Sequence, residues 1–361
     1  MTYRFENTNA LLESLAGSVA ALAVMLHLSG VDLGVSLLLF SAALSFSVLV
    51  RLSITKKQAI SILLLLLITI LSIVFGLMDD SVLLFILLTA NGSAVAGREI
   101  SLRSFLRTGI FVSSLTALVL ALSSPLNFGS RVSVGGVNPV WQSWLFAFGF
   151  VALFNTKLKW KKVRLLILGL LFLAILMTGS RQSMIAVMIA IGASLYINGF
   201  SIKYIFFGIL AGIGTVAAIG ARFSSSGGSR GLLEDAARLE LFAVALGEIN
   251  NRPSGYGFGN FQFLHWDYPH NILLELAHAT GYWGLTVFLL LISYALISLK
   301  NLPQELKIAV VPVFLLSFFV AQLSGSLFSH RLLYFSLGIA LGLDSSRFID
   351  LNLRNQKLKV Y

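Results

Sequence analysis

The sequence contains no cysteine and few charged residues, which make up 11% of its 361 positions. Without cysteine, disulfides, thiol catalysis and cysteine-ligated metal sites are excluded. A soluble domain usually has about 25% charged residues. The deficit of charge, with a hydrophobic share of 57% and a mean hydropathy of +0.90, therefore predicts that lipid surrounds most of the chain.

Acidic residues are also scarce, and the formal net charge is +11. In a membrane protein this excess is expected from basic residues that accumulate in cytoplasmic loops, so it does not predict nucleic-acid binding. No cleavable signal peptide is expected either, because Glu6 and Glu13 lie where a basic segment would be required.

Apolar blocks recur along the chain with lengths of roughly 17–22 residues, which suit helices that cross a bilayer. The fold class expected is all-α, a polytopic transmembrane helical bundle with about 12 spans. The expected spans are 12–30, 34–51, 59–77, 81–97, 105–123, 138–155, 163–178, 182–198, 202–220, 270–299, 307–326 and 330–345. Accordingly, 1–220 holds nine spans, 221–269 forms a large outer loop, 270–345 holds three spans and 346–361 is a basic tail.

The basic residues predict the orientation of these spans. With the N-terminus inside, 19 of the 26 basic residues fall on the cytoplasmic side, including every lysine, and both termini are cytoplasmic. The basic residues left on the outer side are all arginines: Arg131, Arg181, Arg222, Arg230, Arg238, Arg252 and Arg331. Arginine binds phosphate and pyrophosphate oxygens in a bidentate manner, so this pattern hints at an anionic substrate.

The outer loop 221–269 is far longer than the other loops, and long loops in compact proteins are usually functional or disordered. It opens with a Ser/Gly-rich stretch at 224–229, and a helix is expected over 232–249. The apolar second half of that helix, Leu239 to Ile249, predicts an amphipathic helix against the membrane or the bundle. The aromatic residues that follow it favour an ordered loop.

Tyr268-Pro269-His270-Asn271 opens the tenth expected span and contains the best catalytic candidate. Proline suits the first position of a helix, which would place His270 in the first turn. A helix N-terminus disfavours imidazolium, so the ring could act as a general base towards a sugar hydroxyl. The alternative is an interfacial histidine that caps the helix.

Asn271 and Glu275 lie four residues apart, on one face of the same helix. A carboxylate that deep in the membrane needs a partner. Glu275 could bind a sugar hydroxyl, orient an arginine or make a structural hydrogen bond in the bundle. Gly281 and Gly284 are expected to allow close helix approach.

Arg181 follows Ser180, which can cap the eighth span, and a helix N-terminus there would favour a bound pyrophosphate. The alternative is an arginine that reaches to the membrane interface. For Arg238 the alternative to phosphate binding is an i, i+4 salt bridge with Glu234. Further candidates, without a specific role, are Arg252, His265, His278 and Arg331. No outer DxD or HxxxH occurs, and a metal-independent mechanism is expected.

Three groups of residues occur in an order and spacing that resemble the O-antigen ligase and O-antigen polymerase superfamily. They are Arg181-Gln182-Ser183, then Arg238 with the stretch from Asn251 to Phe261, then His270-Asn271 with Glu275, Gly281 and Gly284. The resemblance is strongest over about 165–300.

This resemblance implies a metal-independent, inverting glycosyltransferase of the GT-C type in the bacterial inner membrane. Its donor would be a glycan on undecaprenyl pyrophosphate at the periplasmic face. Arg181 and Arg238 would hold the pyrophosphate, with Arg252, Asn271 and Glu275 as further substrate-binding candidates, and His270 would activate the acceptor hydroxyl. The expected partners are an undecaprenyl-pyrophosphate-linked oligosaccharide, an acceptor glycolipid and the membrane, with a chain-length regulator as a further candidate. No cofactor and no nucleic acid is expected.

The superfamily divides by acceptor. A polymerase transfers glycan to the next lipid-linked repeat unit, and a ligase transfers it to lipid A–core. The form Tyr-Pro-His-Asn-Ile-Leu-Leu-Glu and the short chain favour a polymerase, with a ligase as the alternative. A transporter or flippase is a further alternative, but it would be expected to show internal repeats and broken helices at mid-membrane. A scaffold would leave the outer arginines and His270 without a role.

Overall fold

The computed structural model describes residues 2–29, 41–43, 80–96, 98–124, 132–156, 158–203, 212, 230–323 and 325–343. These residues form eleven α-helices and one short 3-10 helix. The prediction of an all-α fold is confirmed for them. The expected spans 34–51, 59–77 and 202–220 lie outside the described residues, apart from a few positions.

The other expected spans correspond to helices of the structure. They are α1 (Thr2–Ser29), α4 (Asp80–Ala96), α5 (Glu99–Ser123), α6 (Pro139–Phe154), α7 (Lys161–Met177), α8 (Arg181–Ile197), α12 (Ile272–Lys300), α13 (Gln304–Leu323) and α14 (Arg331–Gly342). Most boundaries agree within a few residues, but α1 begins ten residues before the expected span. The loop between the ninth and tenth expected spans contains α10 (Arg230–Asn251) and a short helix that the sequence did not predict, α11 (Asn260–His265).

By length and composition, four helices among the described residues could cross a membrane: Ala10–Ser29 of α1, then α5, α12 and α13. Several shorter helices are also apolar, namely Val82–Ala96 of α4, α6, α8 and α14. A polytopic membrane protein is therefore consistent with the structure.

Glycines let neighbouring helices approach closely. A Cβ on Gly92 of α4 would meet the carbonyl oxygen of Phe335 in α14, and a Cβ on Gly338 of α14 would meet that of Thr89 in α4. Small residues at such contacts are typical of helices that associate in lipid, where burial of apolar surface gives little driving force. Aromatic rings fill the adjoining core, where Phe105 of α5 stacks on Phe335 with centroids 4.4 Å apart.

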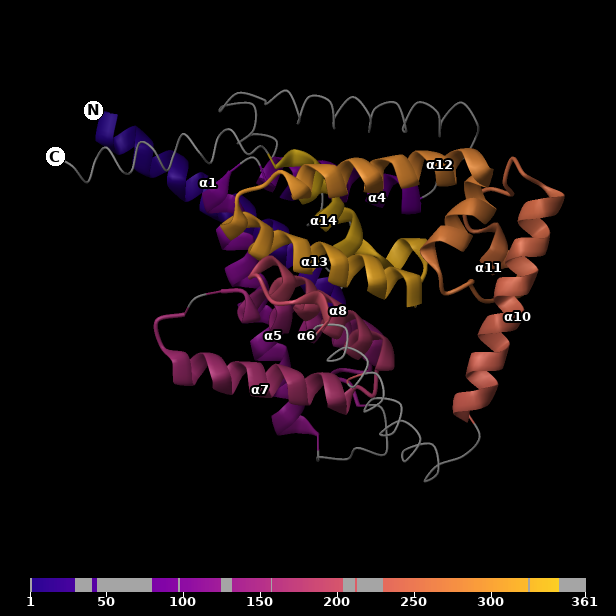
Figure 1. Cartoon of the computed structure of the whole chain (residues 1–361), viewed down its shortest axis with the longest axis horizontal. Coiled ribbons are helices and arrows are strands. Elements are labelled where there is room, and N and C mark those ends of the chain that lie inside the picture. Colours follow the sequence, from indigo (N-terminus) through magenta and orange to yellow (C-terminus); the bar gives the residue numbers. More distant parts are fainter. Residues whose placement is uncertain are drawn as a thin grey trace.

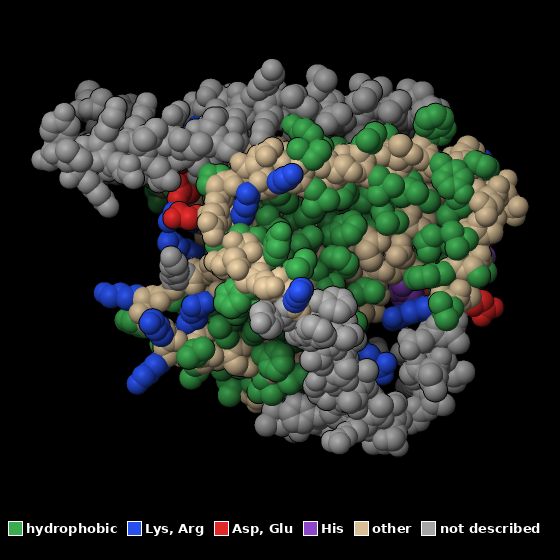
Figure 2. Space-filling view, viewed as in Figure 1, with side chains coloured by type: hydrophobic (Ala, Val, Ile, Leu, Met, Phe, Trp, Pro, Cys, Tyr) green, Lys and Arg blue, Asp and Glu red, His purple; other side chains and the backbone are tan. Residues whose placement is uncertain are grey.

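Figure 1 shows α10 running across one end of the bundle, at a steep angle to α12 and α13, with α11 beside it. We call this the α10 end. At this end α12 begins and contacts α10 and α11, while α13 ends. Figure 2 shows Lys and Arg side chains gathered at the opposite end, near the start of α7, and a histidine next to basic side chains beside the α10 end.

Candidate active site

His270 lies in the connection between α11 and α12, two residues before α12 begins at Ile272. The prediction that Pro269 starts the helix and that His270 lies in its first turn is wrong. The N-cap is Asn271, whose side-chain oxygen accepts hydrogen bonds from the backbone N–H groups of Leu273 and Leu274 at 3.0 and 3.1 Å. His270 therefore has non-helical backbone, with a φ of 53° in the left-handed region. Such a conformation is uncommon for a residue other than glycine and is often found at functional sites.

The His270 ring is mostly buried and has one carboxylate beside it. Its Nε2 atom lies 3.6 Å from Oδ1 of Asp267, and the ring meets the edge of Tyr268 with centroids 4.6 Å apart. The other nitrogen, Nδ1, is buried and has no hydrogen-bond partner among the described residues. A proton on Nε2 would face Asp267 and leave Nδ1 with a free lone pair. Asp267 was not singled out in the sequence, although it lies only three residues from His270.

Burial is the main cause that lowers the pKa of His270 below its usual value of 6.5. The positive charge of Arg238 lowers the pKa further, while the negative charge of Asp267 opposes both. The ring is therefore neutral at pH 7 and able to accept a proton, as expected of a general base. The sequence predicted a neutral ring, but for the wrong reason, since the cause is burial and Arg238 rather than a position inside a helix.

Arg238 belongs to α10 and is partly buried, and its charge acts on both Tyr268 and His270. The fold thus brings together two candidates that lie 32 positions apart in the sequence. The alternative interpretation, a salt bridge with Glu234, concerns a side chain outside those that the structure describes.

The other two arginines are differently placed. Arg181 is the first residue of α8 and is exposed, without an ion pair to any described residue. Ser180 is the N-cap residue of α8, as expected, but its side chain makes no capping hydrogen bond. Arg252 is exposed after the end of α10, with its guanidinium 5.3 Å from the centre of the Tyr256 ring, a cation–π contact.

Asn271 and Glu275 are both engaged within the protein. Besides capping α12, Asn271 donates from Nδ2 to the carbonyl oxygen of Gln322 at 3.1 Å. The buried carboxylate of Glu275 accepts a hydrogen bond from the backbone N–H of Leu327 at 2.9 Å. Of the alternatives for Glu275, the structure shows the structural hydrogen bond, which ties the start of α12 to the connection between α13 and α14.

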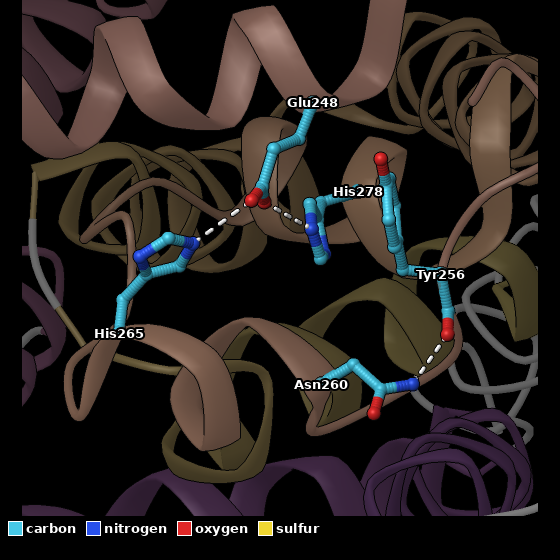
Figure 3. A network of polar contacts seen from close by, with 5 residues as sticks. All are labelled: Glu248, Tyr256, Asn260, His265 and His278. Carbon is cyan, nitrogen blue, oxygen red and sulfur yellow. Dashed lines mark hydrogen bonds and ion pairs between the residues drawn. The ribbon is translucent and has the colours of Figure 1, made fainter. Parts of the chain in front are cut away.

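A second polar cluster lies next to this site and centres on Glu248, which the sequence did not single out (Figure 3). One Glu248 oxygen lies 3.0 Å from Nε2 of His265, and the other lies 2.8 Å from Nε2 of His278. The Tyr256 ring stacks on His278 with centroids 4.7 Å apart and planes at 7°. We call Glu248, His265 and His278 the Glu248 clamp, because they join α10, α11 and α12.

A break in α12 next to the clamp allows the loop to bind there. Gly281 has a φ of 71° and a ψ of −171°, which interrupts the helix. The carbonyl groups of His278 and Ala279 then accept hydrogen bonds from the N–H groups of Tyr256 and Gly257, both at 2.8 Å. The loop thus replaces hydrogen bonds that the broken helix lacks, as required of a kink that remains stable.

Gly281 approaches a loop rather than another helix. A Cβ on Gly255 would lie 2.5 Å from the nitrogen of Gly281, and a Cβ on Gly281 would meet the oxygen of Pro253. The prediction of a close helix approach is therefore wrong for Gly281, because the close partner is the loop after α10. A Cβ on Gly284 would meet only the side chain of Thr280 in its own helix.

No group of three or more His, Asp or Glu side chains suited to a metal ion occurs within the described part of the chain. In the Glu248 clamp, each imidazole points its Nε2 at a different oxygen of the carboxylate. The carboxylate itself is what the two rings share.

Comparison with protein families gives a match that covers this site. Residues 166–289 match the family model described as O-antigen ligase. These residues are an O-antigen ligase family domain. No curated protein matches the chain significantly.

The O-antigen ligase domain begins within α7 and ends within α12, so it contains Arg181, Arg238, Arg252 and His270. Its extent agrees with the range of about 165–300 over which the sequence resembles the superfamily. The expected enzyme class, a glycosyltransferase of the O-antigen ligase and polymerase type, is confirmed by this match.

Proposed function

We propose that this protein is a surface-polysaccharide polymerase, which transfers glycan from undecaprenyl pyrophosphate to the next lipid-linked repeat unit. The reaction takes place at the periplasmic face of the bacterial inner membrane, with inversion at the anomeric carbon and without a metal. The observation that carries the proposal is His270, a buried and neutral imidazole beside Asp267 and under the influence of Arg238, within an O-antigen ligase domain.

In this mechanism, His270 removes the proton from the acceptor hydroxyl as its oxygen attacks the anomeric carbon of the donor sugar. The bond between that carbon and the pyrophosphate oxygen breaks, and undecaprenyl pyrophosphate leaves. Asp267 stabilises the imidazolium that forms, because its carboxylate lies on the Nε2 side of the ring.

Arg238 binds the pyrophosphate and stabilises the negative charge that develops on it as the bond breaks. Arg181 and Arg252 are exposed cations without an ion pair to any described residue, and they complete the binding of the lipid-linked donor. Asn271 and Glu275 act indirectly, since their hydrogen bonds fix the start of α12. The distribution of basic residues supports a topology in which 221–269 is periplasmic and both termini are cytoplasmic.

A ligase is the second candidate, because the matching family is described as O-antigen ligase. The form of the Tyr268–Glu275 segment favours the polymerase. The chemistry at His270 is the same for both, so the difference concerns only the acceptor.

Deletion of the gene in a host that makes a smooth surface polysaccharide tests this proposal. Glycolipids from the deletion strain are compared on a gel with those after complementation by wild type or His270→Gln. A single repeat unit on lipid A–core, with the ladder restored only by wild type, is expected for a polymerase. Loss of all capped lipid A–core, with long glycan on undecaprenyl pyrophosphate, would show a ligase instead. An unchanged ladder in the deletion strain would contradict both.

A further inference from the structure

Five buried polar atoms, all in or next to the first turns of α6, α8, α12 and α14 or the last turn of α13, have no hydrogen-bond partner among the described residues. They are Trp144 Nε1, Gln182 Oε1, His270 Nδ1, Gln322 Nε2 and His330 Nε2. A buried polar group without a partner is costly, and such groups in native proteins call for an explanation. Thr89 Oγ1 and Arg164 Nε are also buried without a partner among the described residues, but they belong to α4 and α7.

Two of these side chains, Trp144 and His330, are in direct contact and form the centre of a polar layer. Trp144 of α6 stacks on His330 with centroids 5.6 Å apart, and His330 directly precedes α14. Gly325 lies against both, because a Cβ there would be 2.7 Å from each ring. The layer therefore joins the start of α6 to the start of α14.

The other three members are linked to this layer through neighbouring residues. Ser143, next to Trp144, shares a hydrogen bond of 2.5 Å with Ser183, which is next to Gln182 in α8. Gln322 is linked to the His270 segment because its carbonyl oxygen accepts the hydrogen bond from Asn271. We call these five side chains the orphan layer.

The chemistry of the orphan layer suits hydroxyl groups. Trp144 donates, the free amide nitrogen of Gln322 donates, the free amide oxygen of Gln182 accepts, and a neutral imidazole can do either. The neighbouring charged groups are engaged elsewhere, since Glu275 accepts from Leu327 and Arg331 has contacts of its own. Uncharged donors and acceptors match the hydroxyl groups of a sugar better than a pyrophosphate.

We propose that the orphan layer binds the sugar that carries the acceptor hydroxyl group and presents that hydroxyl to Nδ1 of His270. This inference rests on the proposed function, because it takes His270 as the base. Trp144 and His330 are only 2% and 3% exposed, so they form the floor of the subsite. Gln182 and Gln322 are partly exposed, and rotation of their side chains would open it.

Trp144→Phe is the most direct test, because it retains an aromatic ring of similar shape and removes the unpartnered N–H. If this N–H has no role in binding, its removal should leave the stability of the protein unchanged or improved and should not alter the kinetic constants of transfer. If it binds the acceptor sugar, the KM for the acceptor rises by about 3- to 10-fold, as for the loss of one hydrogen bond. Gln322→Met is an independent second variant with the same expectation, and Trp160→Phe, at an exposed tryptophan before α7, is the matched control.

The assay uses the full chain in lipid nanodiscs, with glycan-loaded undecaprenyl pyrophosphate from the deletion strain as donor. The acceptor is the single-repeat lipid or lipid A–core, whichever supports transfer. We expect both variants to raise the acceptor KM, with the donor KM and the unfolding temperature unchanged. An unchanged acceptor KM, an effect on the donor KM or a loss of folded protein in both variants would overturn the subsite. Absence of transfer by wild type with either acceptor would instead remove the proposed function itself.

Discussion

Glu248→Ala is predicted to detach α10 from α12 and so to separate Arg238 from His270. The carboxylate of Glu248 binds His265 of α11 and His278 of α12, and the His278 side chain is 1% exposed. Loss of the carboxylate leaves the buried His278 nitrogen without a partner, which costs about 1–3 kcal/mol. Loss of the more exposed His265 contact adds about 0.5–1.5 kcal/mol. The contact between α10 and α12 is thus weakened by about 1.5–4.5 kcal/mol in total.

Hydrogen exchange measures this effect locally. Opening of the segment from Ala245 to Asn251 becomes easier, and because 1.4 kcal/mol corresponds to a factor of ten, exchange there accelerates by about tenfold or more. The rate of glycan transfer should fall in the same variant, because Arg238 lies on the same helix as Glu248 and is displaced when that helix opens. Glu248→Gln should have a smaller effect, since an amide oxygen can still accept from one imidazole.

Glu240→Gln is the matched control, because Glu240 is an exposed acid of the same helix. It should leave exchange and activity as in wild type. Unchanged exchange over α10 and α11 in Glu248→Ala would refute the clamp. Faster exchange with full activity would show that the clamp does not position Arg238.

Further predictions concern pH, backbone and charge. Activity should rise with pH through the pKa of His270, which lies below 6.5, because the base works in its neutral form. Asp267→Asn should move this rise in the kcat–pH profile to lower pH, because the negative charge of Asp267 raises the pKa of His270. A rise at the same pH as in wild type would show that Asp267 does not act on His270. Gly255→Ala should destabilise the protein by about 2 kcal/mol or more, because its φ is +88° and the added Cβ collides with Gly281. A thermal unfolding curve like that of wild type would contradict this close contact. Arg181→Lys should reduce the rate of glycan transfer by about tenfold or more, because lysine cannot bind a phosphate in a bidentate manner. Arg107→Lys, at an exposed arginine of α5, should leave this rate unchanged. Equal rates for the two variants would show that only the charge of Arg181 matters.

The spans of the bundle could be predicted from the sequence because an apolar run long enough to cross lipid has almost no alternative to a helix. The start of α12 was predicted two residues too early because the segment contains two competing signals. Pro269 suits the first helical position, but Asn271 caps the helix with its side chain, and the cap determines where the helix begins. The short helix α11 was missed because six residues carry too little periodicity.

The site was predictable only where a residue type alone carries the chemistry. His270, Arg181 and Arg238 stand out as a possible base and as outer arginines. The role of Glu275 depends on Leu327, 52 positions away, so the sequence left three alternatives open. Glu248 is an ordinary helix residue until folding places it between two histidines.

The central claim is that His270 is the base of a glycosyl transfer at the α10 end. Wild type and His270→Gln are purified, reconstituted in nanodiscs and supplied with a glycan-loaded undecaprenyl pyrophosphate donor and the single-repeat lipid acceptor. The account predicts that wild type lengthens the glycan and releases undecaprenyl pyrophosphate. His270→Gln should remain folded, bind the donor and transfer at least about 100-fold more slowly, since general base catalysis contributes about 10²–10⁴-fold. Transfer by a folded His270→Gln at a rate near that of wild type would contradict the account.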